Sequence, residues 1–233
     1  MSVITLISVQ NKDKNRCNVF VDGEFNFAAY IDLIIKYGLK KGDELSDNLK
    51  EEILNEDLKT YSFSLALKYL QRGLKTKKQV VDFLKRKSCP DNVIYGTIDR
   101  LKELDYITDV EYAKRYIETF SLSSGKRLLA YKLMSKGVKK ADIEIADANV
   151  EIDSREVAAN IAEKKLKNKT IDRIVLSKTF RYLIGKGFSY DDAEYATSRL
   201  SPVPKRQSTI ISYFFSKYFN APSEKFIKVT VKP

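Results

Sequence analysis

The stretch TKKQVVDFLKRKSC, residues 76–89, decides the fold of this 233-residue chain. Thr76 and Gln79 have the spacing of a capping box, in which a hydroxyl and a side chain three residues later satisfy free amides at a helix start. Val81 and Leu84 lie three residues apart, so they share one helical face. The small Ser88 then follows the basic end of the segment. The stretch therefore predicts a short amphipathic helix with a defined beginning and end.

The same pattern returns twice, because Leu84, Leu133 and Leu183 lie 49 and 50 residues apart. Each leucine follows an apolar residue three positions earlier: Val81, Ala130 and Phe180. Each is followed by a lysine and a small residue: Lys87-Ser88, Lys136-Gly137 and Lys186-Gly187. A glycine at that point is typical of a left-handed helix end. Upstream, an alanine precedes an apolar residue by four positions in all three copies: Ala66/Leu70, Ala113/Ile117 and Ala162/Leu166. Each unit is thus predicted to be a three-helix repeat.

Repeats of this kind stack, because the apolar face of one unit needs a neighbour to cover it. The predicted fold class is mainly α, with tandem three-helix repeats that form an elongated array and a small β-containing N-terminal module. A single helical bundle with coincidental internal similarity is the alternative. The predicted domains are residues 1–59 (β-hairpin plus helices), 60–107, 108–152 and 153–200 (repeats 1 to 3), and 201–233 (a basic tail).

The first sixty residues indicate strands before helices. Ile4–Val9 and Cys17–Val21 are β-branched runs, and Asp22-Gly23 favours a tight hairpin turn into Phe25–Phe27. Helices are expected at residues 28–37 and 43–57.

The composition excludes several classes of active site. The chain has no histidine, which removes imidazole acid–base chemistry and His-ligated zinc, and its two cysteines, Cys17 and Cys89, cannot form a cysteine-rich metal site. No P-loop motif is present, and no apolar run is long enough for a membrane span. We therefore expect a cytoplasmic protein that is not an enzyme, with no catalytic residue, metal or cofactor.

Positive charge is the strongest chemical signal. The chain carries 42 Lys and Arg against 31 Asp and Glu, a net charge of +11, and the excess lies after the first sixty residues. Such a surface favours a polyanion or an acidic partner, although it is also compatible with a merely solvated surface. The candidate recombinase- or DNA-binding residues are Lys77, Lys78, Arg86, Lys87, Lys126, Arg127, Lys132, Lys136, Lys178 and Arg181. Interleaved aromatic residues either stack on bases or belong to the core: Tyr69, Tyr116, Tyr131, Phe180 and Tyr182.

Three ordered segments carry a family likeness: KKQVVDFLKRK at 77–87, IDRLKELDYITD at 98–109 and GKRL at 125–128. Together with the β-rich head they resemble the RecX family, bacterial regulators of the RecA recombinase, over residues 1–200. The resemblance implies a non-enzymatic protein that lodges in the groove of the RecA filament on DNA and limits ATP hydrolysis, strand exchange and filament growth. Two positions depart from the family: Gly73 replaces the first arginine of an Arg-x-Arg-Ser/Thr pattern, and Asp105 replaces a usual glycine.

The tail carries a different pattern after the Pro202–Pro204 linker. Gln207, Ile210, Tyr213 and Phe214 resemble the box with which partner proteins bind sliding clamps. Three interpretations remain for residues 201–233: a helix docked on the last repeat, a partner-binding peptide, or a segment fused to the natural chain. The leading hypothesis is a RecX-like regulator of a recombinase filament. The alternatives are a helical-repeat protein that binds single- or double-stranded DNA directly, and an adaptor that binds a sliding clamp through the tail.

Overall fold

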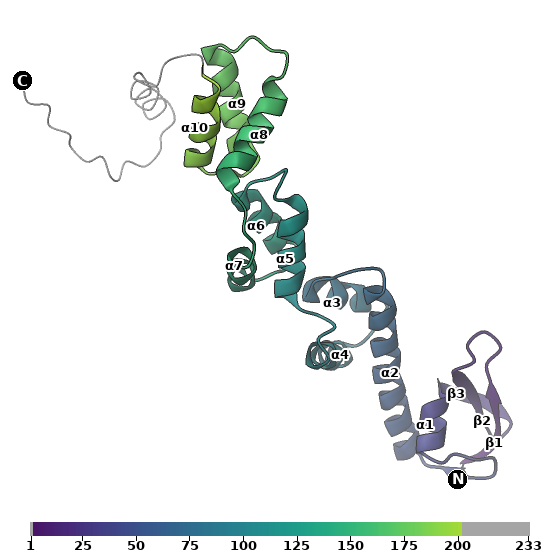
Figure 1. The fold of residues 1–233 in the computed structure, drawn as a ribbon. Helices are drawn as coiled ribbons and strands as arrows, with labels where there is room; N and C mark the ends of the chain where they lie inside the picture. Colours follow the sequence, from purple (N-terminus) through teal and green to yellow (C-terminus); the bar gives the residue numbers. More distant parts are fainter. Residues whose placement is uncertain (1, 202–233) are drawn as a thin grey trace, which may run out of the picture. The chain divides into compact units, whose positions relative to one another are not determined.

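The computed structural model describes residues 2–201, which form a small four-stranded sheet and ten helices, the first of them inserted before the last strand (Figure 1). The sheet is antiparallel in the order β3-β2-β1-β4, and its strands are β1 (Ser2–Val9), β2 (Arg16–Val21), β3 (Glu24–Tyr30) and β4 (Glu44–Leu45). Asp22 and Gly23 form the hairpin turn between β2 and β3 with positive φ angles of 52° and 89°. The hairpin prediction is therefore confirmed, since two positive φ angles match the twist of the flanking strands.

Alternate residues of the strands point into the core of the head. Ile4, Val19 and Phe27 are buried there, and Ile53 of the following long helix completes the same cluster. Period-two burial of this kind is what an antiparallel sheet with one covered face requires.

The structure corrects the expected helix at residues 28–37. β3 continues through Tyr30, and the helix α1 covers only Ile31–Lys36. Ala28 and Ala29 pair with Asn18 and Cys17 of β2, and Ala29 is fully buried in the sheet. Ladder pairing thus overrides the helix propensity of the two alanines.

A single long helix, α2 (Asp47–Leu70), joins the head to the repeats. The sequence predicts two helices here, the first starting at residue 43, but no glycine or proline interrupts residues 47–70. Ser46 caps the helix by accepting a hydrogen bond from the Leu49 amide. The predicted domain boundary at residues 59 and 60 falls within this helix.

The first repeat consists of the second half of α2 with α3 (Lys77–Arg86) and α4 (Asp91–Glu103). Its core is a cluster of apolar side chains that are almost completely buried: Ala66, Val80, Leu84, Ile94, Ile98 and Leu101. The predicted capping box at Thr76 and Gln79 is confirmed, with both reciprocal hydrogen bonds present.

The second and third repeats have the same order of helices. They are α5 (Asp109–Phe120), α6 (Lys126–Ser135) and α7 (Lys140–Ala148), then α8 (Ser154–Leu166), α9 (Arg173–Gly185) and α10 (Tyr190–Arg199). Gly137 and Gly187 end the middle helices with φ angles of +89° and +88°, as predicted, and Ser88 takes the same left-handed conformation with φ +58°. The fold class is mainly α, with three-helix repeats behind a small β-containing head.

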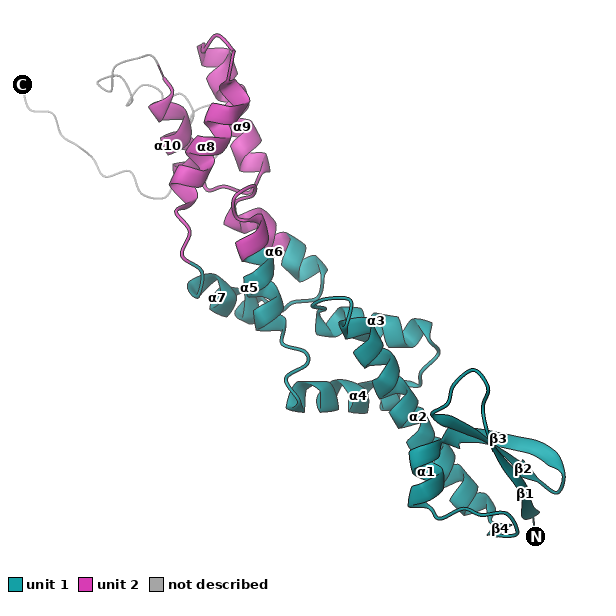
Figure 2. Ribbon diagram, turned by 45° about the vertical axis from the view of Figure 1, so that its right-hand side comes forward, with its two compact units in different colours: residues 1–117, 132–150 teal, residues 118–131, 151–233 magenta. Residues whose placement is uncertain are grey.

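The chain divides into two compact units (Figure 2). Unit 1 comprises residues 1–117 and 132–150, and unit 2 comprises residues 118–131 and 151–233. The boundary passes through α6, so the two ends of this helix contribute to different units. The elongation of the array stays a prediction. Over residues 2–201, no helix is both long and apolar enough to cross a membrane.

Candidate functional site

The most distinctive contact in unit 1 lies where α3 begins. Thr76 is fully buried, and its hydroxyl accepts a hydrogen bond from the Gln79 amide, which completes the helix cap. The same hydroxyl donates a 2.8 Å hydrogen bond to the carbonyl oxygen of Lys136, 60 residues further along the chain. One side chain therefore caps α3 and attaches it to the end of α6.

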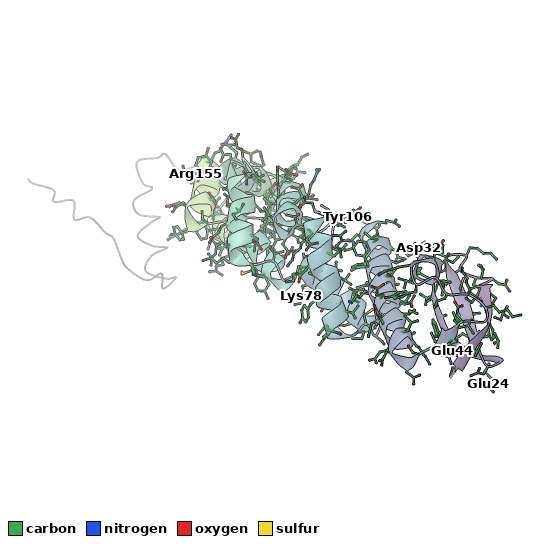
Figure 3. The ribbon with its side chains drawn as sticks, turned by 90° about the horizontal axis from the view of Figure 1, so that it is seen from below. Glu24, Asp32, Glu44, Lys78, Tyr106 and Arg155 are labelled. Atoms are coloured by element: carbon green, nitrogen blue, oxygen red, sulfur yellow. The ribbon has the colours of Figure 1, made fainter. Side chains whose placement is uncertain are left out.

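The turn that receives Thr76 is shaped by Gly137. Its amide donates to the Met134 carbonyl, and the next amide, that of Val138, donates to Leu133, which closes the left-handed end of α6. A β-carbon on Gly137 would lie 2.5 Å from the β-carbon of Lys78. The start of α3, on which Lys78 is labelled in Figure 3, thus lies directly against this turn.

Unit 2 contains the same kind of contact between the following pair of repeats. The amide of Gly125, just before α6, donates a 2.9 Å hydrogen bond to the Lys186 carbonyl, and the Arg127 amide donates 3.1 Å to the Gly187 carbonyl. We call these two contacts junction 1 (Thr76–Lys78 with Lys136–Gly137) and junction 2 (Gly125–Arg127 with Lys186–Gly187). In both, the start of one middle helix meets the glycine turn that ends the next one.

The junctions bring several predicted basic residues together. Junction 1 places Lys77 and Lys78 beside Lys136, and junction 2 places Lys126 and Arg127 beside Lys186, which is not among the ten candidates. Lys78, Lys126 and Arg127 are exposed, and their three partners Lys77, Lys136 and Lys186 are half-buried, so each junction carries basic side chains that reach solvent.

The other predicted basic residues lie elsewhere. Arg86 and Lys87 are at the opposite end of α3, Lys132 lies within α6, and Lys178 and Arg181 are one turn apart on α9. The ten candidates fall in both units, six in unit 1 (Lys77, Lys78, Arg86, Lys87, Lys132, Lys136) and four in unit 2 (Lys126, Arg127, Lys178, Arg181). Their participation in one continuous surface stays a prediction.

Some of the lysines already interact with aromatic rings. The Lys136 ammonium lies 5.8 Å from the centre of the Tyr116 ring, and the Lys186 ammonium lies 5.6 Å from that of Tyr182. Lys165 covers the Tyr182 ring more closely, at 3.8 Å. These cation–π contacts hold the ammonium groups near the surface of the repeats, and the attraction to the rings offsets part of what a bound anion would gain from them.

The interleaved aromatic residues divide between core and surface. Phe180 is buried in the core of the third repeat, and Tyr69 stacks on Phe83 with ring centres 4.2 Å apart. Tyr131 is 68% exposed and Tyr182 is 37% exposed. The core interpretation therefore holds for Phe180, whereas Tyr131 is exposed and the partly exposed Tyr182 ring is covered on one face by Lys165.

Lys77 has an unusual electrostatic environment that the sequence did not indicate. The neighbouring Lys102 ammonium, partial burial and the charge of Lys139 together lower the pKa of Lys77 below its ordinary value, and Asp99 opposes this effect. Lys102 belongs to α4 and Lys139 precedes α7, so residues of two other elements act on the charge of Lys77. Because these positions are distant in sequence, periodicity could not have grouped them.

Among residues 2–201, the acidic residue with a buried side chain is Asp57, and its contacts hold the fold together. Asp57 is 8% exposed, and its carboxylate accepts hydrogen bonds from Arg16 at 2.7 Å and from the Tyr30 amide at 2.9 Å. Within residues 2–201, no group of three or more His, Cys, Asp or Glu side chains could hold a metal ion. The clamp-box residues Gln207, Ile210, Tyr213 and Phe214 lie outside the described residues.

Comparison with protein families places the sheet and two of the repeats in the same group. The regulatory protein RecX N-terminal domain matches residues 2–46. The first and third RecX three-helix domains match residues 63–101 and 151–197. These segments coincide with the sheet and with the first and third repeats.

Two curated relatives are similar over most of their length, and both are named regulatory protein RecX. The protein of Clostridium perfringens strain 13 is 35% identical over 206 residues, covering 86% of this chain and 97% of the relative. That of Clostridium botulinum strain Eklund 17B is 34% identical over 196 residues, covering 82% and 92%.

Two solved structures share the fold. A crystal structure of regulatory protein RecX superposes with a TM-score of 0.69 at 26% identity, covering 85% of this chain and all of that structure. RecX from Lactobacillus salivarius superposes with a TM-score of 0.58 at 27% identity, covering 64% of this chain and 99% of that structure.

Proposed function

Because this chain belongs to the RecX family of regulatory proteins, we propose that it binds a RecA-type recombinase filament and inhibits it. The activities of the recombinase that this chain inhibits are ATP hydrolysis, strand exchange and filament growth, in recombination and DNA repair. The chain acts by binding, and no chemical step is assigned to it.

The observation that carries this proposal is the ordered similarity to the relatives, from the sheet through the third repeat, at about one third identity. The basic junctions support it, because they offer positive charge at helix ends that are joined by hydrogen bonds between repeats. A charged filament groove is a partner that such a surface fits.

The test combines the full chain with a RecA-type recombinase on single-stranded DNA. We expect the rate of DNA-dependent ATP hydrolysis and the yield of strand exchange to fall as the chain approaches the concentration of the recombinase. Unchanged ATP hydrolysis and strand exchange at saturating protein would contradict the proposal.

Charge-reversal variants assign the effect to the junctions. Lys78→Glu combined with Arg127→Glu changes one exposed cation in each junction. The matched control, Lys12→Glu combined with Lys14→Glu, makes the same change in net charge on the β1–β2 turn. We expect inhibition to weaken in the junction variant alone, whereas equal weakening in both would point to net charge instead of a surface.

Direct binding of nucleic acid is a second candidate function. It is favoured by the exposure of the candidate cations, since all ten except the half-buried Lys77 and Lys136 are open to solvent. It predicts binding to DNA in the absence of a recombinase, with an affinity that falls steeply as salt is added. Binding to a sliding clamp through Gln207 to Phe214 stays a prediction, tested by pull-down with wild type and Tyr213→Ala.

A further inference from the structure

One tyrosine ring on α9 holds two lysine side chains in unit 2. The Lys165 ammonium, from the last turn of α8, lies 3.8 Å from the centre of the Tyr182 ring. The Lys186 ammonium, from the C-cap residue of α9, lies 5.6 Å from the same centre. Both lysines are half-buried. Because the ring already orders the two ammonium groups, less side-chain freedom is lost when they bind an anion.

The backbone beside Lys186 is joined to the start of α6. The Gly125 amide donates a 2.9 Å hydrogen bond to the Lys186 carbonyl, and the Arg127 amide donates a 3.1 Å hydrogen bond to the Gly187 carbonyl. A β-carbon on Gly187 would overlap Leu128, so the two segments are in direct contact. These residues all belong to unit 2, which contains the first part of α6 together with α8 and α9 (Figure 2).

α6 presents an exposed aromatic ring one turn beyond Arg127. Arg127 and Tyr131 are four residues apart, so their side chains are neighbours on the surface of the helix, and both are exposed. Tyr131 is 68% exposed, the largest value for an aromatic side chain among residues 2–201. Unlike the Tyr182 ring, the Tyr131 ring contacts no cation and stacks on no other ring within those residues. It is therefore open to a ligand from solvent.

The positive charge of this region is not balanced by ion pairs within residues 2–201. α6 and α9 contain no acidic residue, and both glutamates of α8 lie beside Arg199, at 3.0 and 4.0 Å. Among the ion pairs of residues 2–201, none includes Arg127, Lys165 or Lys186. Three cations therefore remain to bind an external anion.

Junction 1 has an acidic residue where α6 has its exposed ring. Tyr131 lies two residues before Leu133, and Asp82 has the same position before Leu84 in α3. Asp82 is exposed, so its carboxylate would repel a phosphate near this face of α3. An exposed ring beside cations without ion pairs thus distinguishes junction 2 from junction 1.

We propose that unit 2 binds single-stranded nucleic acid through four side chains: Tyr131 stacks on a base, while Arg127, Lys165 and Lys186 bind neighbouring phosphates. Aromatic rings beside cations are the combination on which binding of single strands depends. A duplex offers the same phosphates, but its bases are stacked inside and present no face to the ring. An acidic protein surface matches the cations but gives the ring no base on which to stack. The site rests on the second candidate function, direct nucleic-acid binding, and gives that function a location and a strand class.

The first test measures binding of a labelled single-stranded oligonucleotide to the full chain by fluorescence anisotropy. Tyr131→Ala should weaken the affinity by at least about fivefold, because one stacked base is lost. Tyr131→Phe keeps the ring and should bind like wild type. Tyr95→Ala is the matched control, since Tyr95 is a 53% exposed tyrosine on α4, outside the site. Equal losses in Tyr131→Ala and Tyr95→Ala would contradict the site.

The salt dependence separates the role of the ring from that of the cations. Lys165→Gln combined with Lys186→Gln should reduce the slope of log affinity against log salt by about 0.7 for each phosphate contact that is lost. Tyr131→Ala should leave the slope unchanged, because the ring neutralises no charge. Lys165→Arg combined with Lys186→Arg retains the charge and should retain the slope. An unchanged slope in the glutamine variant would show that these lysines do not bind phosphate.

A fluorescent side chain observes the stacking directly. Tyr131→Trp places the only tryptophan of the chain in the site, because the sequence contains none. A single-stranded oligonucleotide should quench its fluorescence, whereas a duplex of the same length and a glutamate peptide of equal charge should quench it much less. Tyr95→Trp is the control and should show no change. Equal quenching by the peptide would indicate an acidic protein partner, and equal quenching by the duplex would contradict the choice of single strands.

The outcomes distinguish the site from the function on which it rests. If wild type binds the oligonucleotide and the Tyr131 and lysine variants bind equally well, the site is wrong and nucleic-acid binding stands. If wild type fails to bind at low salt, the second candidate function fails and the site falls with it. Because Tyr131 is exposed, Tyr131→Ala should unfold at nearly the temperature of wild type. Weaker binding together with a lower unfolding temperature would indicate a folding defect and would contradict the site.

Discussion

Gly125 and Gly187 lie so close together that a β-carbon on Gly125 would overlap the backbone of Gly187 and of Phe188. The approach is held by hydrogen bonds from Gly125 to the Lys186 carbonyl and from Arg127 to the Gly187 carbonyl. Because both surfaces are backbone, neither can move aside as a flexible side chain would. Junction 2 therefore requires glycine at position 125.

Gly125→Ala should lower the free energy of unfolding of unit 2 by about 1–3 kcal/mol, because the added methyl forces the two backbones apart. Thermal unfolding followed by circular dichroism measures the effect. The control is Gly96→Ala, since Gly96 lies within α4 with no atom near its missing β-carbon. Helix propensity should make that variant more stable by about 0.5–1 kcal/mol. Equal effects of the two substitutions would mean that the close approach is not maintained in solution.

Thr76→Val should destabilise unit 1 by about 2 kcal/mol. The substitution preserves shape but removes both the cap of α3 and the hydrogen bond to Lys136, leaving the Gln79 amide and a carbonyl without that partner. Thr76→Ser keeps the hydroxyl and should retain most of the stability. Denaturant unfolding of the three proteins gives the comparison, and a valine variant as stable as wild type would show that the hydroxyl contributes nothing to junction 1.

Asp57→Ala should loosen the contact between the head and α2. The substitution leaves Arg16 half-buried without its carboxylate and leaves the Tyr30 amide without its acceptor, and breaking such a buried pair costs about 3–5 kcal/mol. Hydrogen exchange of the amides in β2 and β3 should accelerate. The neighbouring Glu56→Ala breaks a more exposed pair with Lys36 and should leave the exchange rates nearly unchanged. Similar protection in both variants would contradict a central role for Asp57.

The contact between α8 and α10 should weaken in acid. Hydrogen bonds from Tyr195, at 2.7 Å, and from Arg199, at 3.0 Å, lower the pKa of Glu156 below its ordinary value of 4.5. A lowered pKa in the folded state means that the stabilisation is fully present above pH 4.5 and disappears as the pH falls through the folded-state value. The difference in unfolding temperature between wild type and Glu156→Gln should therefore shrink below pH 4.5. A difference that is constant from pH 7 to pH 3 would exclude this linkage.

Local signals in the sequence were enough to identify most turns and helix ends. The hairpin at Asp22-Gly23, the cap at Thr76 and the left-handed ends at Gly137 and Gly187 all depend on residues next to one another, so short patterns revealed them. Asp105 fits the same logic, since it takes the left-handed conformation, with φ +56°, at a position where the family resemblance leads us to expect glycine.

Contacts between distant segments were not available from local patterns. The length of β3 depends on pairing with β2. The continuity of α2 is a different case: residues 47–70 contain no glycine or proline, so the expected break near residue 60 had no helix-breaking residue behind it. Lys102 lowers the pKa of Lys77 although the two residues are far apart in the sequence. The basic residues were recognised as a class, while their grouping at the junctions required the tertiary contacts.

Because α2 is one continuous helix, it limits which insertions and deletions the chain can accept between the head and the first repeat. Ile53 sits in the core of the head and Ala66 in the core of the first repeat, on one continuous helix. A single inserted residue between them would turn one core by about 100° relative to the other and separate them by about 1.5 Å. An insertion of about seven residues, which adds two full turns, restores the relative orientation of the two cores almost completely. Insertions and deletions among natural homologues should accordingly avoid this stretch or arrive there in blocks of about seven, whereas the turn between β1 and β2 is free to vary one residue at a time.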